Sequence, residues 1–211
     1  MATAQILVST PTSRFWVVEN FLPEMCQHVH VYTELQKLLL LHNPPIVVFG
    51  KPGVQHRDIG FFSDVSIGYK YSNQMIGSQP LSSSPILKPM LDYVNQSLNT
   101  QFNAILVNKY KDGSDYIGAH SDELDEGKRD AGAETALSVG GIVAGISYGP
   151  ATRTFRITDK KSGNLVLNYQ HKPRTLIVMD GQFQKEFKHG IPQEKSVTEE
   201  RISLTFRCHT K

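Results

Sequence analysis

The apolar positions of the first hundred residues are spaced as in helices at two places. The first such segment runs from Pro23 to about Leu41 and ends at Asn43-Pro44-Pro45. The second starts with Ser84-Pro85, an N-cap followed by a first-turn proline, and continues to about Leu98. We therefore expect two amphipathic helices in this part of the chain.

Shorter apolar runs predict strands on both sides of residue 100. Two lie early in the chain, at Phe15–Val18 and Ile46–Phe49, and the second is followed by a turn at Gly50–Gly53. The later ones are Phe102–Tyr110, Ile142–Tyr148, Arg153–Ile157, Asn164–Tyr169, Arg174–Met179 and Arg201–Arg207, with a hairpin turn at Asp159–Gly163. Many short strands separated by turns are typical of a sandwich, jelly roll or barrel. The pattern predicts an α+β fold in which the helices support an antiparallel β-core.

Composition narrows the class of protein. The chain has 211 residues, of which 39% are hydrophobic, enough for a core and against wholesale disorder. The densest apolar run, Leu38–Leu41, is too short to cross a bilayer, and two cysteines, Cys26 and Cys208, exclude a disulfide scaffold. We expect a soluble intracellular protein without a membrane partner. A net charge of +2 neither requires nor excludes nucleic acid.

A His-x-Asp pair, His120 and Asp122, follows the strand Phe102–Tyr110 and a glycine-containing turn. Residues two apart on an extended backbone point to the same face, so both side chains can bind one metal ion. A third ligand from a distant strand would complete a two-His, one-carboxylate triad, which is typical of Fe(II) oxygenases. A second pair occurs at His56-Arg57-Asp58, and either pair taken alone is also compatible with surface polar residues.

The last predicted strand carries two arginines on one face. Alternation places Arg201, Ser203, Thr205 and Arg207 on that face and Ile202, Leu204 and Phe206 on the other. Burying guanidinium groups is costly unless they meet anions, and a dicarboxylate cosubstrate would meet this need. The alternative is a strand face exposed to solvent.

Together these pieces resemble the AlkB family of Fe(II)- and 2-oxoglutarate-dependent dioxygenases. The resemblance covers roughly residue 45 to the C-terminus and rests on the order and spacing of Asn108-Lys109-Tyr110, Gly113, Asp115, Ile117–Asp122, His189 and Arg201–Arg207. It implies a double-stranded β-helix (jelly-roll) core. We expect a single domain over residues 1–211, with helices and a nucleotide-recognition segment in 1–100 and the catalytic core in 101–211.

The resemblance also implies the roles of individual residues. His120, Asp122 and His189 would be the iron ligands, so that His56 is not a ligand. Arg201 would bind the distal carboxylate of 2-oxoglutarate, and O2 would be the second cosubstrate. The complete set of expected cosubstrate contacts is Asn108, Tyr110, Arg201, Ser203 and Arg207, where Ser203 replaces the asparagine that is common in the family.

The substrate side is similar to that of the homologues that repair duplex DNA. Val48-Phe49-Gly50-Lys51 resembles a hairpin whose aromatic residue enters the base stack, although Phe49 could equally be a core residue. Lys51 and Arg57 would contact phosphates. Tyr69 and Tyr71 would line the base pocket, or else belong to an ordinary strand.

One departure from the family pattern concerns base reading. The family usually has an acidic residue two positions after the metal-binding aspartate, where this chain has Leu124; Glu123 or Asp125 could take that role. The connection Glu123–Gly141 is also long for a compact domain, which is typical of a lid or a binding loop.

The resemblance implies removal of N-alkyl groups from DNA bases by oxidative demethylation, with 1-methyladenine and 3-methylcytosine as substrates. Leu124 and the long connection leave open RNA, another modified base or a protein side chain as the substrate. A third hypothesis is a nucleic-acid-binding module without catalysis. We expect a monomer that works in the nucleus or cytoplasm.

Overall fold

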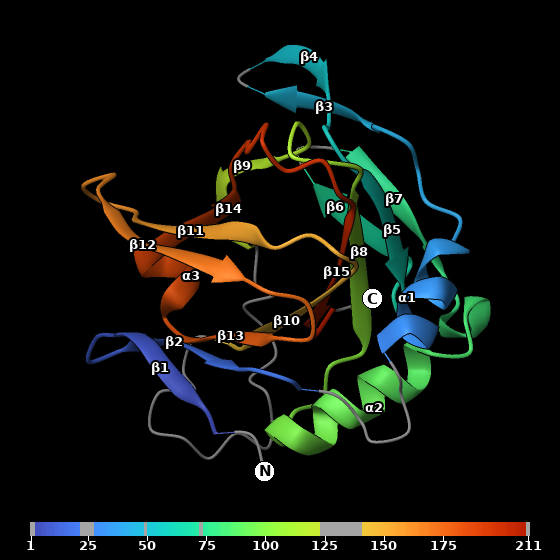
Figure 1. Ribbon diagram of the computed structural model, residues 1–211, viewed down its shortest axis with the longest axis horizontal. Helices are drawn as coiled ribbons and strands as arrows, with labels where there is room; N and C mark the ends of the chain where they lie inside the picture. Colours follow the sequence, from blue (N-terminus) through green and yellow to red (C-terminus); the bar gives the residue numbers. More distant parts are fainter. Residues whose placement is uncertain (1–2, 22–27, 49, 72–73, 123–140, 210–211) are drawn as a thin grey trace.

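The computed structural model describes residues 3–21, 28–48, 50–71, 74–122 and 141–209. Most strands belong to two sheets that face each other (Figure 1). The large sheet has the order β1-β2-β13-β10-β15-β8-β5-β7-β6, and the small sheet has the order β12-β11-β14-β9. Neighbouring strands are antiparallel, except that β5 and β7 run parallel. This arrangement confirms the predicted α+β fold with a jelly-roll core.

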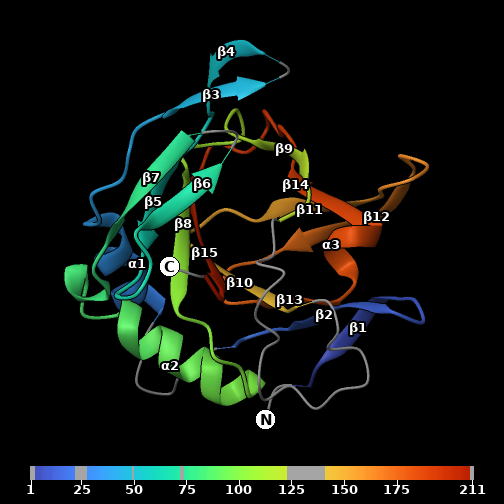
Figure 2. The same cartoon turned by 180° about the vertical axis from the view of Figure 1, so that it is seen from behind.

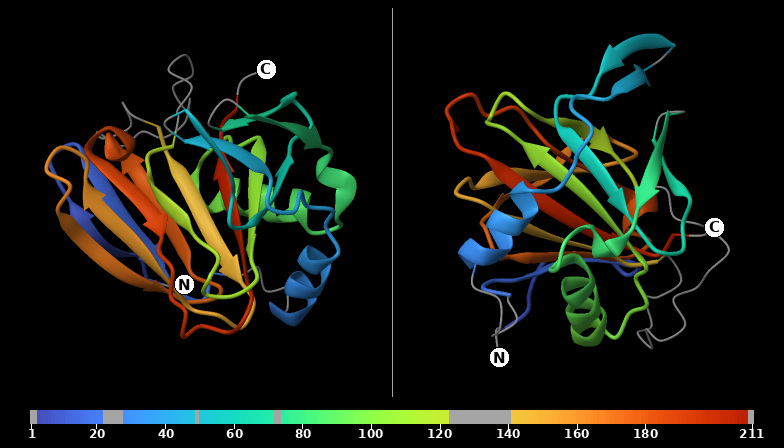
Figure 3. Two further views of the ribbon diagram at one scale, coloured as in Figure 1. Left: turned by 90° about the horizontal axis from the view of Figure 1, so that it is seen from above. Right: turned by 90° about the vertical axis from the view of Figure 1, so that its right-hand side faces the viewer.

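The strand bounds are as follows. The large sheet contains β1 (Gln5–Ser9), β2 (Ser13–Val18), β5 (Asp58–Phe62), β6 (Gly68–Tyr71), β7 (Gln74–Gln79), β8 (Ala104–Tyr110), β10 (Val143–Tyr148), β13 (Leu176–Gly181) and β15 (Arg201–Arg207). The small sheet contains β9 (Ile117–His120), β11 (Arg153–Asp159), β12 (Leu165–His171) and β14 (Phe187–Ile191). A separate hairpin of β3 (Pro45–Val48) and β4 (Lys51–Val54) projects from the body of the protein (Figure 3).

Two helices cover the outer face of the large sheet, α1 (His28–Gln36) and α2 (Leu87–Leu98), while α3 (Phe183–Glu186) is a single turn (Figure 2). Buried side chains of α1 and α2 form one cluster with Ile202, Leu204 and Phe206 of β15. Because strand side chains alternate, the other face of β15 points toward the small sheet. The predicted separation of the two faces of this strand is confirmed.

A second cluster fills the space between the sheets. It joins Phe15, Val17 and Met179 of the large sheet to side chains of the small sheet such as Phe155 and Ile157. The rings of Phe15 and Phe155 stack with centroids 5.4 Å apart. This apolar layer packs the two sheets against each other.

The first helix differs from its prediction. Its expected start at Pro23 lies outside the described residues, and it ends at Gln36 instead of about Leu41. The chain leaves the helix because Leu41 pairs with Ile59 of β5 through two backbone hydrogen bonds of 2.8 and 3.0 Å. Leucine spacing alone does not reveal this competing strand partner.

The second helix begins at Leu87, so the expectation that Ser84 is its N-cap is wrong by a few residues. The Ser84 hydroxyl instead accepts a 3.5 Å hydrogen bond from the backbone N–H of Ile86. The turn expected at Gly50–Gly53 is shorter than predicted. Gly50 has a φ of +76°, but β4 already begins at Lys51.

The other predicted strands and the Asp159–Gly163 hairpin turn are confirmed within one or two residues. The turn is closed by a 2.9 Å hydrogen bond from the Gly163 N–H to the Asp159 carbonyl. Strands from both sides of residue 100 share the large sheet, and the predicted division of the chain at that residue stays a prediction. In the part of the chain that the structure describes, no helix is long and apolar enough to cross a membrane.

Candidate active site

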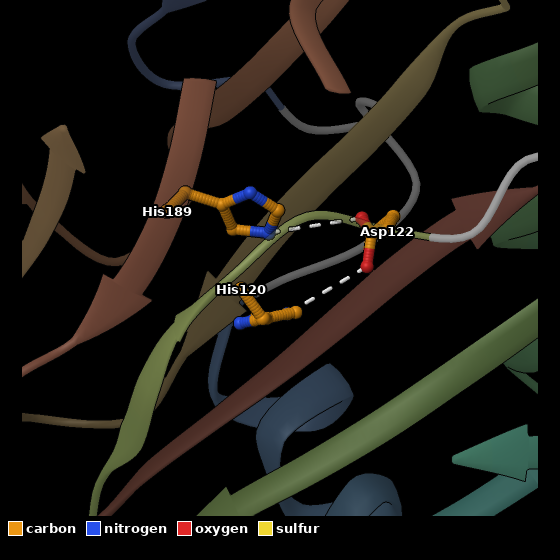
Figure 4. A group of neighbouring side chains, drawn as sticks. All are labelled: His120, Asp122 and His189. Carbon is orange, nitrogen blue, oxygen red and sulfur yellow. Dashed lines mark ion pairs between the residues drawn. The ribbon is translucent and has the colours of Figure 1, made fainter. Parts of the chain in front are cut away.

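His120, Asp122 and His189 meet at one edge of the small sheet (Figure 4). His120 is the last residue of β9, Asp122 follows two residues later, and His189 lies in β14 opposite His120 in the strand register. Pairing of β9 with β14 therefore brings the distant histidine to the His-x-Asp pair. The ligand atoms of the three side chains all lie within 4.8 Å of one another.

The geometry of the three side chains fits a shared metal ion. The Nε2 atoms of His120 and His189 each lie 3.7 Å from an oxygen of Asp122, and Asp122 Oδ2 is buried with no hydrogen-bond partner among the described residues. These separations are too long for hydrogen bonds but short enough for one cation to contact all three groups. Two imidazoles and one carboxylate are the donor set of Fe(II) sites with open coordination positions.

Local contacts prepare His120 and Asp122 for this role. His120 Nδ1 lies 2.9 Å from the Gly118 carbonyl, which can only accept, so Nδ1 donates this hydrogen bond and Nε2 is the nitrogen left to bind a metal ion. The backbone N–H of Asp122 donates a 2.9 Å hydrogen bond to Gln184 Oε1. The Ser121 hydroxyl donates to the Phe187 carbonyl at 2.9 Å. The segment that carries both ligands is therefore fastened to β14 and α3.

The charge of Asp122 is stabilised from within the pocket. Burial alone would raise the pKa of this carboxyl, but Arg207, His189 and His120 together hold the pKa well below its usual range. The Arg207 Nη2 atom lies 3.1 Å from Asp122 Oδ1. The carboxylate is thus ionised, as metal binding requires.

His189 is buried and packs its ring against Phe155 at a centroid distance of 5.3 Å. Burial, followed by the nearby His120, lowers the pKa of His189 to about 3. The imidazole is therefore neutral near pH 7 and keeps a lone pair for a metal ion. Phe155 was not identified from the sequence, because an aromatic residue in a strand is ordinarily part of the core.

A pocket extends from these ligands across the inner face of the large sheet. Its lining includes all five expected cosubstrate contacts, which are Asn108, Tyr110, Arg201, Ser203 and Arg207. Arg201 is 2% exposed, and its Nε and Nη1 atoms have no hydrogen-bond partner among the described residues. Its guanidinium carbon lies 5.5 Å from the centre of the Tyr110 ring. Burial lowers the pKa of Arg201 to about 10, which still leaves a positive charge near pH 7.

A buried cation with two free nitrogen donors is the feature that an anionic ligand would satisfy. The pocket therefore offers an Fe(II)-type donor set at one point and an anchor for a carboxylate at another. Arg207 contacts the metal-ligand candidate Asp122 and also lines the pocket. This arrangement fits a dicarboxylate such as 2-oxoglutarate, which needs both an anchor and access to the metal.

Two tyrosines lie near His120, and one of them, Tyr69, lines the pocket. Tyr69 is 8% exposed and stacks with Tyr71 at 6.3 Å, and Tyr71 meets the edge of the His120 ring at 6.1 Å. The Arg207 guanidinium lies 5.1 Å from the centre of the Tyr69 ring. The structure thus places both aromatic rings next to the ligand triad.

Arg57 is not on the surface, where a phosphate contact would place it. It is 4% exposed, donates a 2.8 Å hydrogen bond from Nε to Asn108 Oδ1 and lies over the Tyr71 ring. Lys51 is exposed on the β3–β4 hairpin. The expected wedge Phe49 and the expected base contact Glu123 lie outside the described residues, as does Leu124.

Two buried residues near Arg201 were missed by sequence reasoning, His171 and Arg153. His171 Nδ1 lies 3.0 Å from Arg201 Nη2. Arg153 is fully buried and forms an ion pair with Glu194 at 3.0 Å. No signal in the chain marked either residue, because both contacts join segments that are far apart in sequence.

Comparison with known proteins gives the family of this chain. Residues 15–207 match the model of the 2OG-Fe(II) oxygenase superfamily. The chain is 29% identical over 169 residues to DNA oxidative demethylase ALKBH2 of Homo sapiens, covering 77% of this chain and 60% of that protein. It is also 29% identical over 147 residues to human alpha-ketoglutarate-dependent dioxygenase alkB homolog 3, covering 66% of this chain and 47% of that protein.

The chain spans 56% to 65% of the length of the mammalian ALKBH2 relatives that it matches. Among solved structures it is similar to OsALKBH1, with a TM-score of 0.59 and 17% identity, covering 97% of this chain and all of that one. A likeness at that identity concerns the fold. The chain therefore belongs to the 2OG-Fe(II) oxygenase superfamily, and the resemblance to the AlkB family is confirmed.

Proposed function

We propose that this protein is an Fe(II)- and 2-oxoglutarate-dependent dioxygenase that demethylates N-alkylated bases in DNA, with 1-methyladenine and 3-methylcytosine as substrates. The observation that carries the proposal is one pocket with two ends. One end holds the triad of His120, Asp122 and His189, and the other holds the buried guanidinium of Arg201, whose Nε and Nη1 atoms have no hydrogen-bond partner among the described residues. The relatives named as DNA oxidative demethylases support DNA as the substrate.

The pocket residues fall into a metal-binding group and a cosubstrate-binding group. His120, Asp122 and His189 would hold iron, and Arg201 would bind the distal carboxylate of 2-oxoglutarate in a charge-assisted pair. Asn108, Tyr110 and Ser203 would orient the cosubstrate. When bound, iron with 2-oxoglutarate and O2 supplies the oxidation of the N-methyl carbon, whose hydroxymethyl form then releases formaldehyde, while 2-oxoglutarate leaves as succinate and carbon dioxide.

Arg207 would keep the ligand set in its binding form. Its guanidinium holds Asp122 ionised and aligned at 3.1 Å, without occupying Oδ2. The same guanidinium borders Tyr69. It therefore contacts both a metal-ligand candidate and one of the two tyrosines.

Tyr69 and Tyr71 would receive the flipped base. Aromatic faces stack on any base, and unpairing costs least for a damaged base, which favours alkylated targets. Tyr71 is half-buried and its ring meets His120 edge-on at 6.1 Å, so a base stacked there lies beside the metal ligands. Lys51 on the projecting hairpin would contact the phosphate backbone.

Formaldehyde release tests the proposal. The purified protein is incubated with Fe(II), 2-oxoglutarate and oligonucleotides that contain 1-methyladenine or 3-methylcytosine, in single and double strands. We expect release that requires 2-oxoglutarate and disappears in His120→Ala. A matched control is His56→Ala, the histidine of the other His-x-Asp pair, whose exposed ring stacks on Tyr116 and should be dispensable for iron binding.

Other results would redirect the proposal. Succinate formation without formaldehyde from these oligonucleotides would contradict the named bases and favour RNA, another modified base or a protein side chain. DNA binding by a folded protein that binds no Fe(II) would favour a non-catalytic module. A monomeric state and a location in the nucleus or cytoplasm stay predictions.

A further inference from the structure

His171 occupies an unusual place for a buried histidine. It is the last residue of β12, is 1% exposed and lines the same pocket as the triad, yet it is not among the three metal-binding candidates. Its Nε2 atom lies 2.8 Å from the Thr175 carbonyl oxygen, and its Nδ1 atom lies 3.0 Å from Arg201 Nη2. Both ring nitrogens are therefore engaged.

These two contacts define the tautomer. A carbonyl oxygen can only accept, so Nε2 must carry the proton that it donates to Thr175. Nδ1 then has a lone pair, and Arg201 donates to it. The environment supports a neutral ring, because burial, followed by the charge of Arg201, lowers the pKa of His171 to about 3.

Contacts with Tyr110 and His171 thus restrict the orientation of the Arg201 guanidinium. The Tyr110 ring lies against its face, with 5.5 Å between the guanidinium carbon and the ring centre, which limits tilting of the plane. The hydrogen bond to His171 lies at one edge, which limits rotation within the plane. The Nε and Nη1 atoms make no hydrogen bond to any residue that the structure describes.

In a neighbouring arginine, Arg153, all three guanidinium nitrogens donate hydrogen bonds within the protein. Arg153 donates to Glu194 Oε2 and to the carbonyls of Asp112, Asp115 and Pro192. The Glu194 carboxylate is itself occupied, since it also accepts from the backbone N–H and hydroxyl of Thr154. Among the described residues, no carboxylate forms an ion pair with Arg201.

The type of side chain that bonds to Arg201 decides whether its positive charge stays available to a ligand. A carboxylate at the place of His171 would hold Arg201 equally well but would neutralise it and compete with an incoming anion. A neutral imidazole fixes the guanidinium and leaves its charge for a ligand. We propose that His171 is a positioning residue that presents Arg201 to the distal carboxylate of 2-oxoglutarate. This inference rests on the proposed function in so far as Arg201 takes that carboxylate.

Two nearly isosteric substitutions separate positioning from simple packing. In His171→Asn the amide oxygen can take the place of Nδ1 and still accept from Arg201. In His171→Gln the amide nitrogen can take the place of Nε2 and keep the bond to Thr175, but the acceptor for Arg201 is lost. A third variant, His171→Asp, keeps an acceptor and adds a competing negative charge.

The assay is calorimetric binding without nucleic acid, using protein loaded with Mn(II) in place of Fe(II) so that no turnover occurs. The ligands are 2-oxoglutarate and 2-oxobutyrate, which has the same 2-oxo acid group but no distal carboxylate. Thermal unfolding of each variant without ligand records the structural effect of each change. Circular dichroism checks that the variants are folded.

We expect His171→Gln and His171→Asp to weaken 2-oxoglutarate binding about tenfold or more, equivalent to about 1.4 kcal/mol. His171→Asn should stay within about threefold of the wild type. Binding of 2-oxobutyrate should change little in any variant. Equal weakening of both ligands, or equal losses in the Asn and Gln variants, would overturn the positioning role.

The binding measurements distinguish a failure of the positioning role of His171 from a failure of the proposed function. If the wild type binds 2-oxoglutarate but releases no formaldehyde from methylated DNA, the substrate assignment fails while the role of His171 is still tested by the variants. If the loaded wild type does not bind 2-oxoglutarate, both this inference and the assignment of Arg201 are overturned.

Discussion

The buried imidazole of His171 should make the stability of this protein depend on pH in a way that one substitution removes. Its pKa is about 3 in the folded protein, against an ordinary value of 6.5 that applies once the chain unfolds. Between these values the unfolded chain binds a proton that the folded protein does not. The free energy of unfolding therefore falls as the pH decreases from about 6.5 toward 3.

The size of the effect follows from the two pKa values. At about pH 7.5 the imidazole is neutral in both states and contributes almost nothing. At about pH 5 the protonation of the unfolded chain lowers the free energy of unfolding by about 2 kcal/mol. His171→Asn removes the titrating group while keeping an acceptor for Arg201, so the variant should escape this loss.

The measurement is urea unfolding of wild type and His171→Asn at several pH values from 7.5 to 5, without metal or 2-oxoglutarate. With a slope of about 3 kcal/mol per molar urea, the difference between the two midpoints should change by roughly 0.7 M across this range. Other titrating groups, including His189, affect both proteins equally and cancel in the difference. Parallel midpoint curves would refute the claim that His171 is buried in the neutral form.

Three further substitutions test the pocket. Arg201→Lys should raise the KM for 2-oxoglutarate about tenfold or more in an assay of succinate formation. The reason is that an ammonium group cannot reproduce a two-point contact to a carboxylate, which is worth about 1.5–3 kcal/mol. An unchanged KM would argue against Arg201 as the anchor. Asp122→Ala should lower the free energy of unfolding of the metal-free protein by about 3–5 kcal/mol in urea unfolding, because Arg207 is left as a buried unpaired charge. His120→Ala should lower it much less. Similar losses in the two variants would contradict the stated role of Arg207. Tyr71→Ala should raise the KM for a methylated oligonucleotide about tenfold, which corresponds to a stacking contribution of about 1–3 kcal/mol. The KM for 2-oxoglutarate should stay unchanged. A change in the KM for 2-oxoglutarate would place Tyr71 at the cosubstrate instead.

Much of the metal and cosubstrate site could be predicted because it depends on local geometry. Residues two apart on a strand share a face, so His120 and Asp122, and likewise Arg201 and Ser203, could be grouped before any fold was known. The structure places the apolar residues of the same strand, such as Leu204, in the cluster under the helices. Short-range periodicity was sufficient for this grouping, whereas the specific role of each residue came from the family resemblance.

The membership of His189 in the triad came from the family resemblance, and its position depends on strand pairing. The register that sets His189 opposite His120 joins segments about seventy residues apart, and no local pattern encodes such a pairing. The same limit applies to the helix that was expected to reach Leu41. Its end is decided by the pairing of Leu41 with Ile59, which is a tertiary contact.

Only the tertiary structure could show how the arginines are used. From the sequence, Arg57 was a candidate for phosphate contact and Arg153 was an ordinary strand residue, whereas both are buried and bonded within the protein. Arg201 is also buried, but two of its nitrogens have no hydrogen-bond partner within the described part of the chain, and the third is bonded to His171. Sequence alone determined which residue types share a strand face, because that depends on backbone periodicity. Which cation remains available to a ligand was decided by the folded arrangement, because it depends on every acceptor that other segments bring within hydrogen-bond distance.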